Sequence, residues 1–90
     1  MTAIEAAKLV DTEGCHVLRP RRNEPGQYDA KHFADGGNKR GWFYLDGFSA
    51  SAIVQVHAAL NDANKAKYEA FPIEKMADIA FKLIAKQRAA

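Results

Sequence analysis

Residues 48–84, which read FSASAIVQVHAALNDANKAKYEAFPIEKMADIAFKLI, decide the fold. In the first part of this stretch, apolar side chains recur three and four residues apart, which is the spacing of one buried stripe on an α-helix. The stripe comprises Ile53, Val56, His57 and Leu60. Ser49 is the expected N-cap, and Phe48 would then pack against Ile53 as a hydrophobic staple. We expect His57 to be a partly buried structural histidine.

Two further helices are predicted after this one. Asn61 separates the first helix from residues 62–71, where Asp62 lies near the positive end of the second helix dipole. Pro72 interrupts the pattern and suits the first position of a third helix. The apolar face of that helix consists of Met76, Ile79, Ala80, Phe81, Leu83 and Ile84. Three helices with short connections must fold back on one another to bury such faces, so we expect Leu60 and Leu83 in the core.

The first fourteen residues predict a short helix. Thr2 and Glu5 have the spacing of a capping box, in which each side chain accepts a hydrogen bond from the backbone of the other residue. Good helix formers follow, and Gly14 suits the end of the helix.

The middle of the chain predicts two strands. Residues 15–19 have an extended pattern that Pro20 ends, because proline has no backbone donor for a ladder. Residues 42–45 place Trp42 and Tyr44 on one face of a second strand, with Phe43 and Leu45 on the other. These strands predict a small two-stranded antiparallel hairpin with a long loop.

Together the patterns predict one α+β domain over residues 1–90. Its parts are the short N-terminal helix, the hairpin and a C-terminal three-helix unit. Ninety residues are too few for two independent cores. Within the domain, residues 42–84 form a strand and a helical scaffold, whereas residues 19–41 form a basic, loop-rich arm.

The basic arm is the candidate interaction surface. Residues 16–40 carry six cationic and three anionic side chains, a local excess of three positive charges in a chain whose net charge is +2. A loop of about twenty residues is unusual in a compact domain and is typical of a functional segment. The residues that we expect to bind a partner are Arg19, Arg21, Arg22, Tyr28, Phe33, Lys39, Arg40 and Trp42.

Composition indicates the cellular setting. The one cysteine, Cys15, cannot form an internal disulfide, and small secreted domains normally need several. The first residues lack the basic and apolar regions of a signal peptide, and the longest uncharged stretch, residues 47–61, is too short to span a bilayer. We therefore expect a cytoplasmic protein without membrane contact.

Chemical motifs are weak in this sequence. Cys15, His16, Asp29 and His32 do not form the paired ligand spacing of a zinc site. We expect Cys15 to be a small buried apolar residue rather than a nucleophile. Residues 35–41 are glycine-rich, but they lack the Gly-Lys-Ser/Thr ending of a phosphate-binding loop and precede a strand. We therefore expect no catalytic residues, no metal, no cofactor and no enzymatic activity.

Residues 42–84 resemble a group of short uncharacterised proteins encoded by actinobacterial phages. The shared features are a Phe-x-Ala-Ser-Ala helix start at residues 48–52, an Ala-Leu helix end at residues 59–60, and a helix-Pro-helix finish around Pro72. The resemblance implies a phage accessory protein that acts in the cytoplasm of an infected bacterial host, and it carries over no site residues.

Two functions remain after these exclusions. The first is a non-enzymatic binding module that contacts a host or phage protein, since aromatic residues and arginine are enriched at interface hot spots. The alternative is a nucleic-acid-binding protein that uses the basic arm from Arg19 to Arg40, where cations near aromatic rings suit phosphate contact and base stacking. The low net charge favours the protein partner. We also expect a homo-oligomer, because a second copy would cover the wide apolar face of the last helix.

Overall fold

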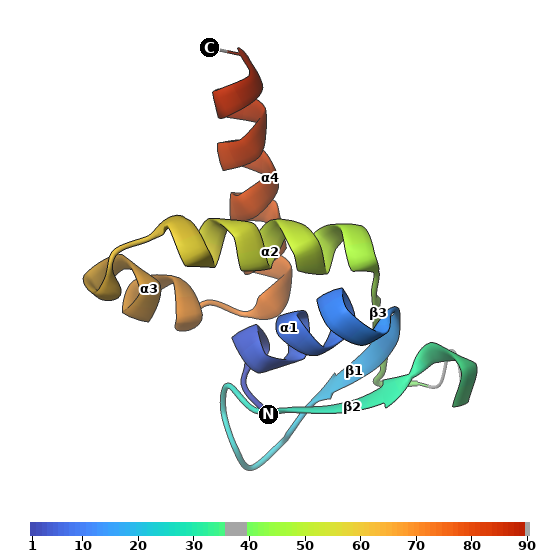
Figure 1. Cartoon of the computed structure of the whole chain (residues 1–90). Coiled ribbons are helices and arrows are strands. Elements are labelled where there is room, and N and C mark those ends of the chain that lie inside the picture. The colour runs from blue at the N-terminus through green and yellow to red at the C-terminus, as the bar shows by residue number, and fades with distance from the viewer. Residues whose placement is uncertain (36–39, 90) are drawn as a thin grey trace.

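The computed structural model describes residues 1–35 and 40–89 of the chain. Within these residues the protein is an α+β domain with four α-helices, three strands and one turn of 3₁₀-helix (Figure 1). The helices are α1 (Ala3–Glu13), α2 (Gly47–Ala59), α3 (Asp62–Glu69) and α4 (Ile73–Ala89). The strands are β1 (His16–Pro20), β2 (Tyr28–His32) and β3 (Phe43–Leu45), and the 3₁₀ turn η1 covers Phe33–Asp35.

The predicted capping box fixes the start of α1. The Thr2 side chain accepts a hydrogen bond from the Glu5 backbone N–H (3.2 Å), and the Thr2 N–H donates to the Glu5 carboxylate (2.8 Å). The same backbone bond lowers the pKa of Glu5. Gly14 ends the helix with a φ of +91°, a conformation that side chains other than glycine rarely adopt.

The sheet has the order β2-β1-β3 with antiparallel pairs, so β1 is its central strand. The predicted two-stranded hairpin is therefore incomplete, because β2 lies inside the stretch that the sequence assigned to a long loop. In β2 the side chains of Tyr28 and Ala30 pack against the core, and Asp29 and Lys31 alternate with them. Because every second residue of β2 is polar, the strand contains no continuous apolar run from which it could be predicted.

The elements are stacked in layers. Figure 1 shows α1 between the sheet and α2, with α4 crossing α2 on the far side. Leu18 from β1 and Ile53 from α2 are both fully buried in the shared core, and Leu45 of β3 joins them. No described helix covers the opposite face of the sheet (Figure 1).

Helix α2 keeps the predicted stripe but starts earlier than expected. Its N-cap is Asp46, whose carboxylate accepts a 2.6 Å hydrogen bond from the Ser49 N–H, and not Ser49. Phe48 therefore lies in the first helical turn, where 82% of the residue is exposed, and the expected staple with Ile53 is wrong. Val56 is buried and His57 half-buried, as the spacing predicted.

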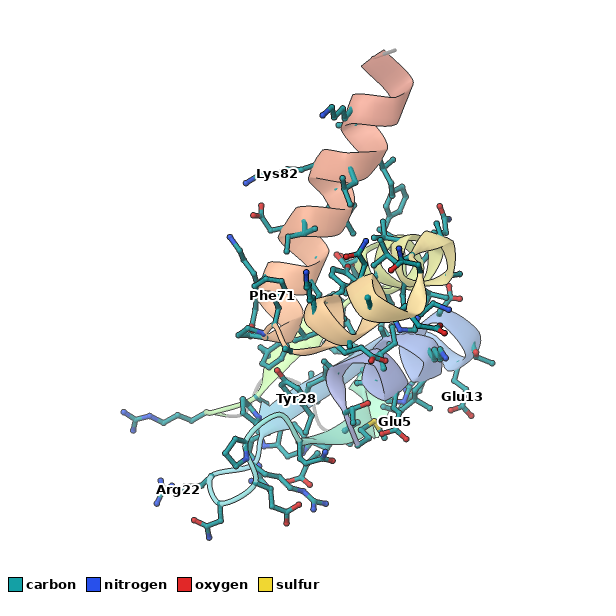
Figure 2. The ribbon with its side chains drawn as sticks, turned by 90° about the vertical axis from the view of Figure 1, so that its left-hand side faces the viewer. Glu5, Glu13, Arg22, Tyr28, Phe71 and Lys82 are labelled. Atoms are coloured by element: carbon teal, nitrogen blue, oxygen red, sulfur yellow. The ribbon has the colours of Figure 1, made fainter. Side chains whose placement is uncertain are left out.

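Two buried tyrosines attach α4 to the rest of the protein. The Tyr28 hydroxyl accepts a hydrogen bond from the Ile73 N–H (3.2 Å), and the Tyr68 hydroxyl donates to the Met76 carbonyl (2.6 Å). Burial raises the pKa of Tyr68 to about 12. Figure 2 shows Tyr28 between the sheet and the start of α4. These bonds explain why the N-terminal half of α4 is held in the core.

The C-terminal half of α4 leaves the core and projects from the domain (Figure 1). Met76 and Ala80 are fully buried, but 42% of Leu83 is exposed, and Phe81 is exposed as well. The expectation that Leu83 is a core residue is therefore wrong. A helix that crosses α2 steeply passes beyond its partner, and only the residues near the crossing are covered.

Candidate functional site

The uncovered face of the sheet carries the candidate site, and we call it the outer face. Strand alternation and the pairing register place on it the side chains of Val17, Arg19, Asp29, Lys31, Trp42 and Tyr44. Arg21, Arg22 and Glu24 lie beside it in the β1–β2 loop, and Figure 2 shows Arg22 at the tip of that loop, pointing away from the domain. Val17 is fully buried, and the other side chains of the outer face lie where a partner can reach them.

Trp42 is at the centre of this face, directly before β3. The guanidinium carbon of Arg19 lies 4.7 Å from the centroid of the Trp42 ring, and Lys31 Nζ lies 4.5 Å from the same centroid. A cation at this distance is attracted by the negative face of the indole. The ring is half-buried, so it is held in place without being removed from the surface.

A carboxylate connects the two strands beside Trp42. Asp29 accepts hydrogen bonds from Arg19 Nη2 (2.9 Å) and from Arg21 Nε (2.8 Å), and Arg21 also contacts Glu24 (3.2 Å). The bonds from Arg19 and then Arg21 lower the pKa of Asp29, while the Asp29 carboxylate raises the pKa of Arg21. These pairs are largely exposed, so they orient the arginines more than they stabilise the fold.

A shallow groove of about 690 Å³ runs along the β1–β2 loop, next to these ion pairs. Its walls are formed by Arg19, Pro20, Arg21, Arg22, Asn23, Glu24, Asp29 and Gly41. Arg22 and Arg40 are exposed and form no ion pair with the described residues. Among the described side chains around the outer face, five are cationic and two, Glu24 and Asp29, are anionic.

Aromatic side chains extend the outer face past β3. The rings of Phe33 and Tyr44 meet edge to face, with centroids 5.1 Å apart, and they are 44% and 48% exposed. The Tyr44 hydroxyl donates to Cys15 Sγ at 2.9 Å, and this bond raises the pKa of Tyr44. Cys15 is half-buried and accepts a hydrogen bond, so the expectation of a buried apolar cysteine is wrong.

The structure brings together most of the residues that the sequence nominated. Arg19, Arg21 and Trp42 meet on the outer face, with Arg22 and Phe33 at its border, and Arg40 is exposed two residues before Trp42. Tyr28 is a correction, because it is only 6% exposed and bonds to the backbone of α4. Lys39 lies outside the described residues.

Lys31 and Asp29 are central residues that the sequence did not nominate. Their place on the outer face depends on the pairing of β2 with β1, which aligns Lys31 with Val17 and Asp29 with Arg19. Sequence alternation within residues 28–32 was the available signal, and it is weak because the strand has only five residues.

The residues considered as metal ligands in the sequence lie apart in the structure. Asp29 and His32 are three residues apart on one strand, so their side chains point to opposite faces of the sheet. In the described ranges, 1–35 and 40–89, no three His, Cys, Asp or Glu side chains are grouped in a way that would hold a metal ion. The same ranges contain no helix with the length and apolar character required to cross a membrane.

His57 has a structural partner. Its Nε2 lies 3.0 Å from the Glu69 carboxylate, and this contact joins α2 to the end of α3. The side chain is half-buried where α2 and α3 meet. His57 is therefore a partly buried residue between helices, as its position on the apolar stripe predicted.

Comparisons with known proteins add no family to these observations: no protein-family model, no curated protein and no solved structure matches the chain. The resemblance to phage proteins stays a prediction, and the function must be argued from the outer face itself.

Proposed function

We propose that the protein is a non-enzymatic binding module whose outer face holds an acidic segment of a partner protein. The observation that carries this proposal is the Trp42 ring held between strands by Arg19 and Lys31 on an open sheet face. Tryptophan and arginine are the residues that most often dominate binding energy at protein interfaces. An acidic side chain that approaches Trp42 meets both cations at once.

The arrangement of charge favours a protein partner over a nucleic-acid backbone. Asp29 already neutralises part of the field of Arg19 and Arg21, and Glu24 neutralises more. A surface that binds phosphates along a strand needs a row of free cations. Fixed ion pairs around one aromatic ring instead suit a partner with a few carboxylates at defined positions.

Nucleic acid is the second candidate, and one observation favours it. Phe33 and Tyr44 form an exposed aromatic pair, and Arg22 and Arg40, elsewhere around the outer face, have no ion pair among the described residues. Bases stack on exposed rings, and free arginines contact phosphates. In this case the binding would centre on Tyr44 rather than on Trp42, which gives the two candidates different critical residues.

The resemblance to actinobacteriophage proteins supports a proposal about where the protein acts in the cell. We propose that the partner is a host or phage protein met in the cytoplasm of an infected bacterium. The binding chemistry argued from Arg19, Lys31 and Trp42 does not depend on this setting.

The test is a selection of short random peptides on the immobilised protein, followed by affinity measurements. Selected peptides should be enriched in Asp and Glu, and Arg19→Ala or Trp42→Ala should weaken their binding at least about tenfold, a hot-spot effect of about 1.4 kcal/mol. Lys8→Ala is the matched control, since Lys8 is an exposed cation on α1 and should leave affinity unchanged.

Two results would overturn the proposal. One is a selection without acidic enrichment. The other is tighter binding of a single-stranded oligothymidylate than of any selected peptide, with loss of binding in Tyr44→Ala and not in Trp42→Ala, which would establish the nucleic-acid function instead.

A further inference from the structure

The edge of β2 that faces away from β1 carries unused backbone hydrogen-bonding groups. In the part of the chain that the structure describes, the sheet has the order β2-β1-β3, so β2 is an edge strand. The Phe33 N–H, directly after β2, donates to the Cys15 carbonyl (3.0 Å), and this bond identifies the odd-numbered residues of β2 as those that bond to β1. Alternate residues of an antiparallel strand point their backbone groups to the opposite side. The N–H and C=O of Ala30 and the N–H of His32 therefore point away from the sheet.

The beginning of this edge is already paired with the N-terminus. The Tyr28 N–H donates to the Met1 carbonyl (2.7 Å), and the Met1 amine donates to the Tyr28 carbonyl (3.0 Å). A bridge between Thr2 and Gln27 is also antiparallel, and Figure 1 shows the N-terminus beside the start of β2. Within residues 1–35 and 40–89, Ala30 has no backbone partner on the same side. The edge thus accepts an antiparallel strand at its start and is open where that strand would continue.

The side chains of β2 indicate which kind of strand fits this edge. Lys31 lies on the outer face with Nζ 4.5 Å from the centroid of the Trp42 ring, and it forms no ion pair with the described residues. Asp29, two residues earlier, is already bound by Arg19 and Arg21. Side chains directly opposite on neighbouring strands have Cβ atoms about 4.5–5.5 Å apart, and opposite charges there are stabilising. A strand that carries a carboxylate opposite Lys31 therefore fits the edge.

A second copy of this chain fits the edge less well. In each copy the backbone groups of Tyr28 are taken by Met1. Pairing of Ala30 with His32 of the other copy would place the two Lys31 side chains directly opposite each other. Like charges in that position are destabilising.

We infer that the acidic segment of the partner binds as a fourth, antiparallel strand along the edge of β2, with its backbone bonded to Ala30 and His32 and a carboxylate beside Lys31. This mode of binding rests on the function proposed for the outer face and specifies the conformation of the bound segment. Main-chain bonds supply the affinity of an added strand, and alternate side chains supply its specificity.

Strand geometry assigns different roles to alternate residues of the bound segment. Residues opposite Ala30 and His32 point their N–H groups toward β2. Acidic residues opposite Lys31 point their side chains to the outer face and their N–H groups away from β2. The two sets of backbone donors can therefore be removed separately.

The experiment uses a capped hexapeptide of alternating threonine and glutamate, with NMR titration of the full chain to measure affinity. N-methylation of the three threonines removes the donors that face β2 and should weaken binding at least about tenfold. N-methylation of the three glutamates is the matched control. It adds the same number of methyl groups on the side away from β2 and should change the affinity less than about twofold.

Amide hydrogen exchange of the protein provides a second measurement that requires no substitution. The Ala30 N–H should exchange rapidly in the free protein and at least about tenfold more slowly when the hexapeptide is bound. The Lys31 N–H, which bonds to β1, should exchange slowly in both states. Protection of the Ala30 N–H in the concentrated free protein would show a second copy on the edge and would overturn the inference.

The remaining outcomes separate the bound conformation from the proposed function. Strand addition is overturned if both methylated peptides bind like the parent, or if methylation of the glutamates causes the loss. It is also overturned if the hexapeptide fails to bind at about 1 mM while peptides from the acidic selection bind, in which case the function of the outer face stands. If no acidic peptide binds, the proposed function fails and the added strand with it.

Discussion

The outer face and the helix end of the domain, where α4 projects beyond α2, are two exposed regions with opposite chemistry. The outer face combines Arg19, Lys31 and Trp42 with a paired carboxylate, and its side chains are held by cation–π contacts and ion pairs. At the helix end, Phe48, Phe81 and Leu83 are exposed, and Lys86 is the one charged residue among those that line the grooves between α2 and α4. The first region is organised by charged and aromatic contacts within the chain, and the second is apolar and exposed.

The contrast explains why the average composition of the chain is a poor guide to its surfaces. A net charge of +2 describes neither region, because the positive excess lies at the sheet end and the neutral apolar area lies at the helix end. The cations that an acidic segment would need are therefore found at the outer face, and the grooves between α2 and α4 have Lys86 alone among their lining residues.

The largest expected effect comes from the core that supports both regions. Ile53 is fully buried in α2, so Ile53→Ala should cost about 2–5 kcal/mol of unfolding free energy. Leu83→Ala, at an exposed site of similar size, should cost less than about 1 kcal/mol. Both are measured by urea unfolding of the full chain. Equal losses would mean that the end of α4 belongs to the core and is no free surface.

A smaller effect tests the attachment of α4 through Tyr68. Its pKa is raised from about 10 in the unfolded chain to about 12, because burial disfavours the tyrosinate. The corresponding stability is fully present below about pH 10 and is lost as the pH rises through about 12, by roughly 2 kcal/mol. Urea unfolding of the wild type and of Tyr68→Phe, compared at neutral and alkaline pH, measures this loss.

Tyr68→Phe should be less stable than the wild type at neutral pH by about 1 kcal/mol, because it lacks the hydrogen bond to Met76. The difference should shrink or reverse at alkaline pH, since phenylalanine does not ionise. A constant difference across the pH range would show that Tyr68 ionises as freely in the folded protein as in the unfolded chain.

The smallest expected change in stability comes from Asp29→Asn, which alters the charge of the outer face. Asp29→Asn frees Arg19 and Arg21 from their shared carboxylate, and the free energy of unfolding should change little because the ion pairs are exposed. Binding of a selected acidic peptide should become stronger and more sensitive to salt. Weaker binding in this variant would mean that Asp29 orients the arginines more than it competes with the partner.

The same ion pairs give a pH dependence with a definite sign. The pKa of Asp29 is lowered in the folded protein, so its contribution to stability is present above its ordinary value near 3.9 and is lost as the pH falls. The wild type and Asp29→Asn should therefore differ at neutral pH and converge in acid, which thermal unfolding at both pH values measures.

Local signals in the sequence predicted much of the fold. The capping box of Thr2 and Glu5, the N-cap Asn61 and the break at Pro72 act within a few residues, so the helices could be located from the chain alone. Strand β2 was missed because its evidence is its pairing with β1, which no local pattern reveals. The N-cap of α2 was misplaced because Asp46 and Ser49 are both good caps.

The sequence predicted only part of the candidate site, because some of its residues are brought together by strand pairing. Arginines and Trp42 could be nominated from residue type, but Lys31 joins them only through strand register. Tyr28 shares their residue class yet faces the core, since its position in β2 decides its direction. Leu83 was placed in the core because it lies on the apolar stripe of the last helix. The stripe runs past the point where α2 covers α4, and the sequence does not show where that cover ends.

A titration of the chain's single tryptophan tests the central claim most directly, because Trp42 lies at the centre of the outer face. The fluorescence of Trp42 is followed while a selected acidic peptide is added to the wild type, Leu83→Glu and Arg19→Ala. We predict a saturable change with equal affinity for the first two proteins and at least about tenfold weaker binding for Arg19→Ala. Peptide binding that leaves the Trp42 emission unchanged, or that Arg19→Ala does not weaken, would contradict the assignment of the outer face as the binding site.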